Sequence, residues 1–162
     1  MLEFFQTYSY IGLFFILFTE ESGIPLPIPG DIFIALAAGL PNSNYLLIVT
    51  TVVLSTLCGS TILFSLSRKF GHLLITKYGK YIKITPEKVA KIEKWFAKHG
   101  GRAIIIGRLI PGLRTVTPIV AGTFRVPYKS FWTNTLIAAF IWANIYYLIG
   151  RFFGEIVLTF IK

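Results

Sequence analysis

The chain has 162 residues, of which 54% are hydrophobic and 16% aromatic, and its mean hydropathy is +0.69. A soluble domain of this length could not bury so much apolar surface, so the composition excludes a soluble protein. The net charge of +9 is concentrated in one segment between apolar runs, which favours a cytoplasmic loop of a membrane protein over a nucleic-acid binder. We therefore expect an all-α integral membrane protein with no nucleic-acid partner, and no signal peptide is evident.

The first predicted element is a re-entrant hairpin over residues 8–40. Two apolar runs, 8–18 and 32–40, lie on either side of the stretch TEESGIPLPIPGD. Each run is about half as long as the roughly 20 residues that a helix needs to cross the hydrocarbon core. Prolines remove backbone donors and stop a helix, so this stretch should divide the hairpin into two half-helices. The residues predicted to form the broken tip are Pro25, Pro27, Pro29 and Gly30.

The second element is a transmembrane helix over residues 45–67, which carries enough consecutive apolar residues to span the bilayer. Ser55 and Gly59 form a small-xxx-small pair, which predicts a close helix crossing. Cys58 is the only cysteine, which excludes an intramolecular disulfide and a multi-cysteine metal site, and we expect it to be a small packing residue. The chain has only two histidines, and both lie in the basic loop described next. We expect no metal and no cofactor.

A basic loop with an amphipathic helix follows over residues 68–99. Ten of the sixteen basic residues lie between Arg68 and Arg102, against two acidic ones. The positive-inside rule predicts that this loop is cytoplasmic and lies near anionic headgroups. From Pro86 to the glycines at 100–101, the pattern predicts a helix that rests with one apolar face on the inner membrane surface. That face carries Val89, Ile92, Trp95 and Phe96. A calmodulin-like or acidic protein partner is the alternative.

The last two elements are a second re-entrant hairpin over residues 100–124 and a transmembrane helix over residues 130–150. In the hairpin, charged residues and helix breakers interrupt the apolar sequence GGRAIIIGRLIPGLRTVTPIVAGTF. The interrupting residues are Gly107, Arg108, Pro111, Arg114 and Pro118. The C-terminal stretch FFGEIVLTFIK is too short to span the bilayer and should extend the last helix past Gly150.

The order of these elements predicts an inverted repeat. Each half of the chain is a broken hairpin followed by a full span. Because the first span ends at the cytoplasmic basic loop, the first hairpin should enter the membrane from outside and the second from inside. Such opposed, interrupted segments mark the binding site in many transporters. The inverted repeat is predicted from hydropathy and breaker placement, because the halves share no letter-by-letter similarity. We expect a multi-pass protein of the cell membrane.

Five charged residues at the two tips could form one site. If the hairpins enter from opposite faces, their tips meet near the midplane, where a bare carboxylate needs a partner, water or a proton. Arginine binds phosphate with a planar fork, and helix N-termini at the breaks favour anions. Carboxylates without a partner at that depth have raised pKa values and can bind protons. The five residues are Glu20, Glu21, Asp31, Arg108 and Arg114. The alternatives are a static salt-bridge network that only locks the tips together, and a water-exposed mouth position for Glu21.

Two stretches, EESGIPLPIPGD and IGRLIPGLRT, resemble the signature motifs of the DedA family of VTT-domain (SNARE-associated) proteins. The resemblance runs from about Tyr10 to Gly150 and includes VAGTFRVPYKSF and IWAN. It implies two opposed re-entrant hairpins, a bacterial plasma membrane location and movement of lipids across the bilayer. The implied substrates are undecaprenyl phosphate and phospholipids such as phosphatidylethanolamine, with the proton-motive force implicated. The family's functional acids and arginines match Glu20, Asp31, Arg108 and Arg114, whereas Glu21 has no secure counterpart.

The resulting hypothesis is a translocase for a phosphate-bearing lipid, and not an enzyme. Arg108 and Arg114 would bind the phosphate, while Glu20 and Asp31 would take protons and pair with the arginines. The alternatives are a proton-coupled transporter of small solutes or ions, a membrane lipid phosphatase and a structural scaffold. A phosphatase would need a nucleophile, and no serine, cysteine or histidine stands beside the arginines in the sequence.

Overall fold

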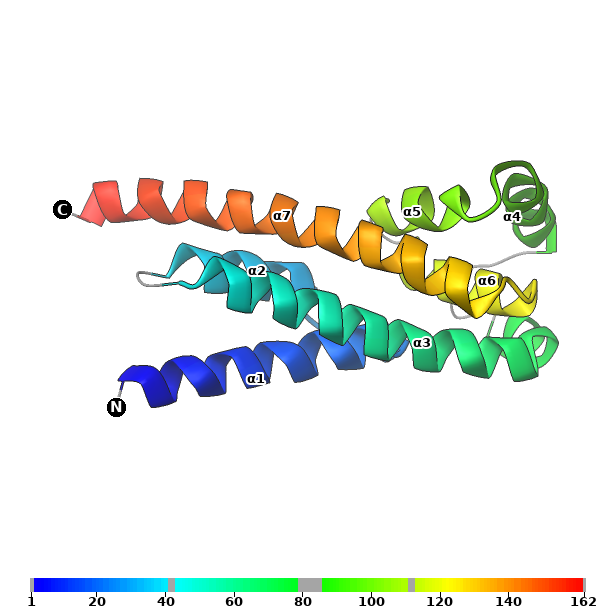
Figure 1. The fold of residues 1–162 in the computed structure, drawn as a ribbon, viewed down its shortest axis with the longest axis horizontal. Coiled ribbons are helices and arrows are strands. Elements are labelled where there is room, and N and C mark those ends of the chain that lie inside the picture. Colours follow the sequence, from blue (N-terminus) through cyan, green and yellow to red (C-terminus); the bar gives the residue numbers. More distant parts are fainter. Residues whose placement is uncertain (1, 41–42, 79–85, 111–112, 162) are drawn as a thin grey trace. The chain divides into compact units, whose positions relative to one another are not determined.

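The computed structural model describes residues 2–40, 43–78, 86–110 and 113–161, and side chains over 10–40, 43–71, 90–91, 94–96, 98–110 and 113–153. Over these residues the secondary structure is entirely helical (Figure 1), which confirms the predicted all-α class. The helices are α1 (Leu2–Glu21), α2 (Gly30–Gly39), α3 (Tyr45–Tyr78), α4 (Pro86–His99), α5 (Arg102–Leu109), α6 (Val116–Thr123) and α7 (Tyr128–Ile161).

Two of the helices are long and apolar enough to cross a membrane. These are α3 over Tyr45–Gly71 and α7 over Tyr128–Phe153. Each helix has 34 residues in all, so each is about 51 Å long at 1.5 Å per residue, against a hydrocarbon core of about 30 Å. Helix α3 therefore continues well past the predicted end of its span at residue 67. Helix α7 includes the C-terminal stretch up to Ile161, which confirms that this stretch extends the last helix.

The chain divides into two compact units, and both long helices contribute to each of them. Unit 1 contains α1, α2, the part of α3 up to Gly59 and the part of α7 from Ala139. Unit 2 contains the part of α3 from Ser60, then α4, α5 and α6, and the part of α7 up to Ala138. Each unit therefore contains one pair of consecutive helices, α1–α2 or α5–α6, together with segments of the two long helices.

In unit 1, glycines allow helices to approach closely. A Cβ atom placed on Gly59 would lie 2.6 Å from the carbonyl oxygen of Phe18 and 2.8 Å from Cβ of Glu21. Ser55, one turn earlier, is fully buried. The predicted close helix crossing at this pair is therefore confirmed, and α1 is the partner helix. A second close approach joins α7 to α2, where Gly150 contacts the backbone of Ala35.

The other face of α3 explains why the expectation for Cys58 is wrong. Cys58 is exposed, on a stripe of side chains that recurs every four residues and includes Leu54 and Ile62. Residues four apart lie on the same face of a helix. The packed face of α3 is the one that carries Ser55 and Gly59, so Cys58 lies on the helix surface that the protein leaves uncovered.

The core of unit 2 is aromatic. The rings of Phe64 and Phe131 stack with centroids 4.1 Å apart. Around them lie side chains from α4, α5 and α6, namely Phe96, Ala103, Ile104, Val116, Val120 and Ala121. The guanidinium of Arg68 donates to the carbonyl oxygen of Val126 at 2.6 Å and lies over the Tyr128 ring. Helices α5 and α6 pack on each other, and α4 packs on both.

Helix α4 is the amphipathic helix that the sequence predicts, and it ends before Gly100, whose φ of 55° is left-handed. Part of its apolar face is covered by protein, because Phe96 is buried in the core of unit 2 and Trp95 packs against that core. The side chains of Val89 and Ile92 lie outside the described residues. The prediction that this apolar face rests on the membrane surface is therefore wrong for Phe96 and Trp95, which pack in the protein.

Candidate functional site

The break between α1 and α2 is built by a glycine and three prolines. Helix α1 ends in a Schellman motif, in which Gly23 has a φ of 92° and its N–H donates to the carbonyl oxygen of Glu20 at 3.0 Å. The next N–H, of Ile24, donates to the carbonyl oxygen of Thr19 at 3.3 Å. The segment that follows carries exposed prolines at positions 25, 27 and 29. Since proline cannot continue a helix, the chain restarts as α2 only at Gly30.

The carboxylate of Glu20 binds the N-terminus of α2. Its Oε2 accepts a hydrogen bond from the backbone N–H of Gly30 at 3.0 Å. A negative charge at this end of a helix is favoured by the helix dipole and by the unpaired N–H groups there. A Cβ atom on Gly30 would collide with this carboxylate and would lie 2.7 Å from Cδ2 of Leu17. Gly30 therefore allows the carboxylate of α1 to reach the backbone of α2.

The carboxylate of Asp31 is held by a residue that the sequence analysis did not assign to the site. Asp31 lies in the first turn of α2, and its Oδ1 accepts a hydrogen bond from Nε1 of Trp142 at 2.8 Å. Trp142 lies on α7 and is 7% exposed. The sequence carried one signal for it, because a buried indole N–H usually has an acceptor and the predicted apolar span around Trp142 offers few. Trp142 thus links the first hairpin to the last helix.

Glu21 is buried, at 2% exposed, which argues against the alternative of a water-exposed mouth position. It is the last residue of α1 and lies beside Gly59 of α3, where the two helices cross. Burial of a carboxylate costs several kcal/mol unless it is paired, hydrogen-bonded or protonated. Glu21 is therefore part of the packed interior of the first hairpin.

The two arginines flank the break between α5 and α6. Arg108 lies in the last turn of α5 and is 2% exposed. The helix dipole favours a positive charge at this C-terminal end. Arg114 lies two residues before α6 and is 8% exposed. Nearly complete burial of two guanidinium groups is costly, and such residues within membrane proteins mark functional sites by default.

Two predicted tip residues of the second hairpin lie inside helices and not at the break. Gly107 is within α5, where a Cβ atom would lie 2.6 Å from Oγ1 of Thr117 on α6. Its role is close packing of α5 on α6. Pro118 is the third residue of α6, where the N–H has no intrahelical partner, so proline is tolerated there. Pro111 lies outside the described residues.

The structure thus gathers the acidic residues around the α1–α2 break of unit 1 and the arginines around the α5–α6 break of unit 2. A contact between the acidic group and the arginines would lie between the two units, and it stays a prediction. Among the described residues, no three His, Cys, Asp or Glu side chains are grouped so that they could hold a metal ion.

Sequence comparison identifies the class of protein. The VTT domain matches residues 28–152, so the chain belongs to the VTT-domain family, and the resemblance to DedA proteins is confirmed. This range begins within the α1–α2 break and ends near the last turns of the predicted second span. Membership makes the chain a membrane protein, in agreement with the two long apolar helices.

Individual relatives are between 26% and 32% identical to the chain over the aligned residues. An uncharacterized membrane protein YbfM of Bacillus subtilis (strain 168) is 32% identical over 92% of this chain and 93% of its own length. Protein DedA of Escherichia coli (strain K12) is 29% identical over 94% and 72%. Undecaprenyl phosphate transporter A of Staphylococcus aureus (strain NCTC 8325 / PS 47) is 30% identical over 92% and 76%. A relative in Lactococcus lactis is named alkaline phosphatase-like protein. No solved structure matches the chain significantly.

Proposed function

We propose that this protein translocates the phosphate-bearing headgroup of a membrane lipid across the bilayer, and that it is a transporter and not an enzyme. The observation that carries the proposal is the burial of Arg108 and Arg114 on both sides of one helix break. A pair of guanidinium groups so placed can bind a phosphate through charge-assisted, bidentate hydrogen bonds. The relative named undecaprenyl phosphate transporter A supports a phosphate-bearing lipid as the substrate.

In this proposal both hairpins are re-entrant and enter from opposite faces, as an inverted repeat whose two breaks meet near the midplane. Helix α2, with 10 residues, fits a half-membrane arm. Helix α1, with 20 residues, is longer than such an arm, so its N-terminal turns would extend beyond the hydrocarbon region. The basic segment 68–102 would lie in the cytoplasm and contact anionic lipids there.

The two groups of charged residues have different roles in the proposed cycle. The phosphate displaces carboxylate partners of Arg108 and Arg114 and is itself displaced on the other side. Asp31, oriented by Trp142, takes a proton when the arginines take the phosphate and gives it up on release. Glu20, bound to the N-terminus of α2, provides the second exchangeable carboxylate. The acyl tails stay in the lipid while the headgroup crosses the site.

The proposal is tested by lipid exchange in liposomes that contain the purified protein. Fluorescent polyprenyl phosphate, phosphatidylethanolamine and phosphatidylcholine are compared, and the outer-leaflet fraction is followed by chemical quenching. We expect liposomes with the wild-type protein to exchange at least one phosphate-bearing lipid faster than protein-free liposomes do. Arg108→Ala and Arg114→Ala should lower the exchange rate to that of protein-free liposomes. The matched control is Arg102→Ala, which removes an exposed arginine from the same α5 helix and should change the rate by less than about twofold.

One alternative is favoured by a specific observation, the name of the alkaline phosphatase-like relative. A lipid phosphatase would release inorganic phosphate from the polyprenyl phosphate probe, and Arg108→Ala would stop that release. Translocation leaves the phosphate ester intact. If release of inorganic phosphate explains the change in fluorescence quenching, the protein is a phosphatase and the translocase proposal is wrong. Solute flux without lipid exchange would favour a proton-coupled solute transporter, and an unchanged rate in every arginine variant would favour a scaffold.

A further inference from the structure

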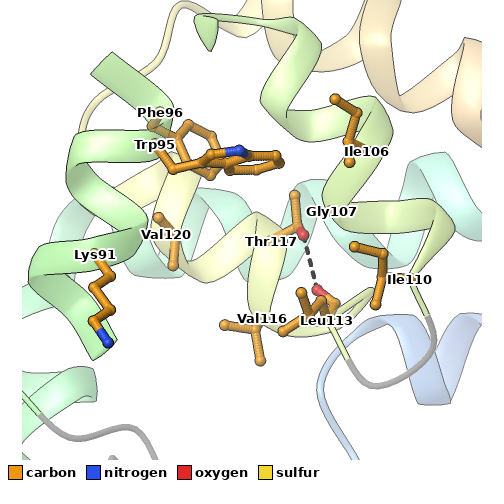
Figure 2. Close-up of a pocket in the computed structure, with 10 residues that line it drawn as sticks. All are labelled: Lys91, Trp95, Phe96, Ile106, Gly107, Ile110, Leu113, Val116, Thr117 and Val120. Carbon is orange, nitrogen blue, oxygen red and sulfur yellow. Dashed lines mark hydrogen bonds between the residues drawn. The ribbon is translucent and has the colours of Figure 1, made fainter. Parts of the chain in front are cut away.

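Unit 2 contains a groove of about 490 Å³, and none of the five charged residues of the proposed site lines it. It lies between α4 on one side and α5 on the other, with α6 beneath, as Figure 2 shows. Its volume falls within the range of about 300–1,000 Å³ that is typical of small-molecule sites. The lining does not include Glu20, Asp31, Arg108 or Arg114. The proposed translocation site therefore does not account for the groove.

The walls of the groove are apolar. Trp95 and Phe96 of α4 face Ile106 of α5, and Val116 and Val120 of α6 lie between them. The hydroxyl of Thr117, a polar group in the wall, donates to the carbonyl oxygen of Leu113 at 2.8 Å. Its hydrogen is therefore used inside the protein. A ligand that fills this groove must offer hydrocarbon, because polar groups buried there would lose their hydrogen bonds to water.

Three of the apolar side chains in the wall remain exposed. Ile106, Ile110 and Leu113 keep more than a third of their surface accessible, although they line a concave site. A hydrocarbon chain in the groove would cover them. This chain is a membrane protein, so acyl chains are the hydrocarbon that reaches its surface in the greatest amount.

The lining of the groove includes one positively charged side chain. Lys91 is the charged residue among those that line it, and its side chain is exposed. Lys94 and Lys98 are exposed on the same helix but do not line the groove, so Lys91 is the charge beside it. A lysine beside an apolar groove matches an amphiphile with a negative headgroup and a hydrocarbon tail, because each part then meets its complement.

We propose that the groove between α4, α5 and α6 binds one acyl chain of an anionic membrane lipid, whose headgroup pairs with Lys91. The bound lipid fixes α4 on the α5–α6 hairpin and supplies apolar contacts that the protein does not make itself. This site is separate from the proposed translocation site, and it would exist whether or not the protein moves lipids.

The test uses the full-length protein in liposomes with two photoreactive probes that carry the same diazirine-labelled acyl chain. One probe is phosphatidylglycerol, which is anionic, and the other is phosphatidylcholine, which is not. Cross-linked residues are located by mass spectrometry at physiological salt. We expect phosphatidylglycerol to cross-link to Ile106, Ile110 and Leu113 more strongly than phosphatidylcholine does.

Two pairs of variants separate the groove from the rest of the surface. Lys91→Gln should reduce phosphatidylglycerol cross-linking in the groove about fivefold, as expected for one lysine contact with an anionic lipid. Lys94→Gln, its control on the same helix, should change it by less than about twofold, since an exposed charge away from the groove is screened by salt. Leu113→Trp should fill the groove and bring cross-linking at Ile106 to background, whereas Leu136→Trp, at an exposed position of α7, should not.

Several results would overturn the proposal. Cross-links spread evenly over the exposed faces of α3 and α7, and unchanged by Leu113→Trp, would show that the groove is not a lipid site. Equal labelling by both probes, or unchanged cross-linking in Lys91→Gln, would exclude the proposed pairing of an anionic headgroup with Lys91. A groove covered by a second copy of the chain would exclude the probes, and wild type would then show no cross-links at Ile106. Lipid exchange measured on the same samples keeps the outcome separate from that of the translocase proposal.

Discussion

The two helix breaks of this protein differ in charge and in construction. The α1–α2 break is long and proline-rich, and it carries acidic side chains that bind backbone and indole N–H groups of their own unit. The α5–α6 break is shorter, carries arginines, and follows a close helix contact at Gly107. Similar hydropathy patterns thus produce two hairpins of opposite charge. The acidic side chains of the first break thus lie beside N–H groups of unit 1, whereas the second break is flanked by two buried guanidinium groups in unit 2.

The largest effect should come from removing the cations of the second break. If Arg108 binds phosphate as proposed, Arg108→Ala removes charge-assisted hydrogen bonds that contribute about 1.5–3 kcal/mol each, so the exchange rate should fall at least about tenfold. Arg108→Lys keeps the charge but loses the planar fork, so it should recover only part of the rate. Leaflet exchange of polyprenyl phosphate measures both. Full activity in Arg108→Ala would mean that the two breaks do not differ in the way we describe.

A large effect on stability is expected at the close crossing of the first hairpin. Gly59→Leu places side-chain atoms where Phe18 and Glu21 already lie, and overpacking of this kind costs about 1–3 kcal/mol. Gly12→Leu is the matched control, because no atom lies within 4 Å of a Cβ atom at Gly12. Thermal unfolding of both variants in detergent measures the difference. Equal unfolding midpoints for the two variants would contradict a close contact between α1 and α3 at Gly59.

A smaller effect is expected on the pH dependence of transport. If Asp31 takes and releases the proton, wild-type exchange should differ between acid and alkaline conditions, and Asp31→Asn should flatten that response. Trp142→Phe removes the hydrogen bond to Asp31 but keeps an aromatic ring, and it should shift the profile without abolishing exchange. An Asp31→Asn protein with the wild-type profile would exclude a proton role for the acidic break.

The smallest effect is expected from neutralising the acid at the N-terminus of α2. Glu20→Gln keeps an oxygen that can accept from Gly30 N–H but loses the charge, so unfolding should become easier by about 0.3–1 kcal/mol. Glu20→Ala loses the acceptor as well and should cost more. Denaturant or thermal unfolding distinguishes the two. A Glu20→Ala protein as stable as Glu20→Gln would show that the hydrogen bond to α2 contributes little.

The sequence predicted the helical class, the amphipathic helix α4 and the close crossing at Gly59, because hydropathy period and small-residue spacing depend on local chemistry. It did not predict the indole of Trp142 beside Asp31, which depends on a tertiary contact between residues 111 positions apart. It also placed Gly107 and Pro118 at a break, since glycine and proline are usual breakers. Close packing on Thr117 and a position in the first turn of α6 account for these residues in the structure.

The most direct test of the central claim asks whether the two breaks meet. In a Cys58→Ala background, Ile24→Cys and Leu113→Cys place one exposed thiol beside each break, and a short bifunctional thiol reagent is added to membranes. Leu40→Cys with Leu113→Cys is the control, because Leu40 follows the far end of α2. We predict an intramolecular cross-link for the first pair and none for the control. Efficient cross-linking of the control together with none of the Ile24 pair would contradict a site formed by the acidic and basic breaks.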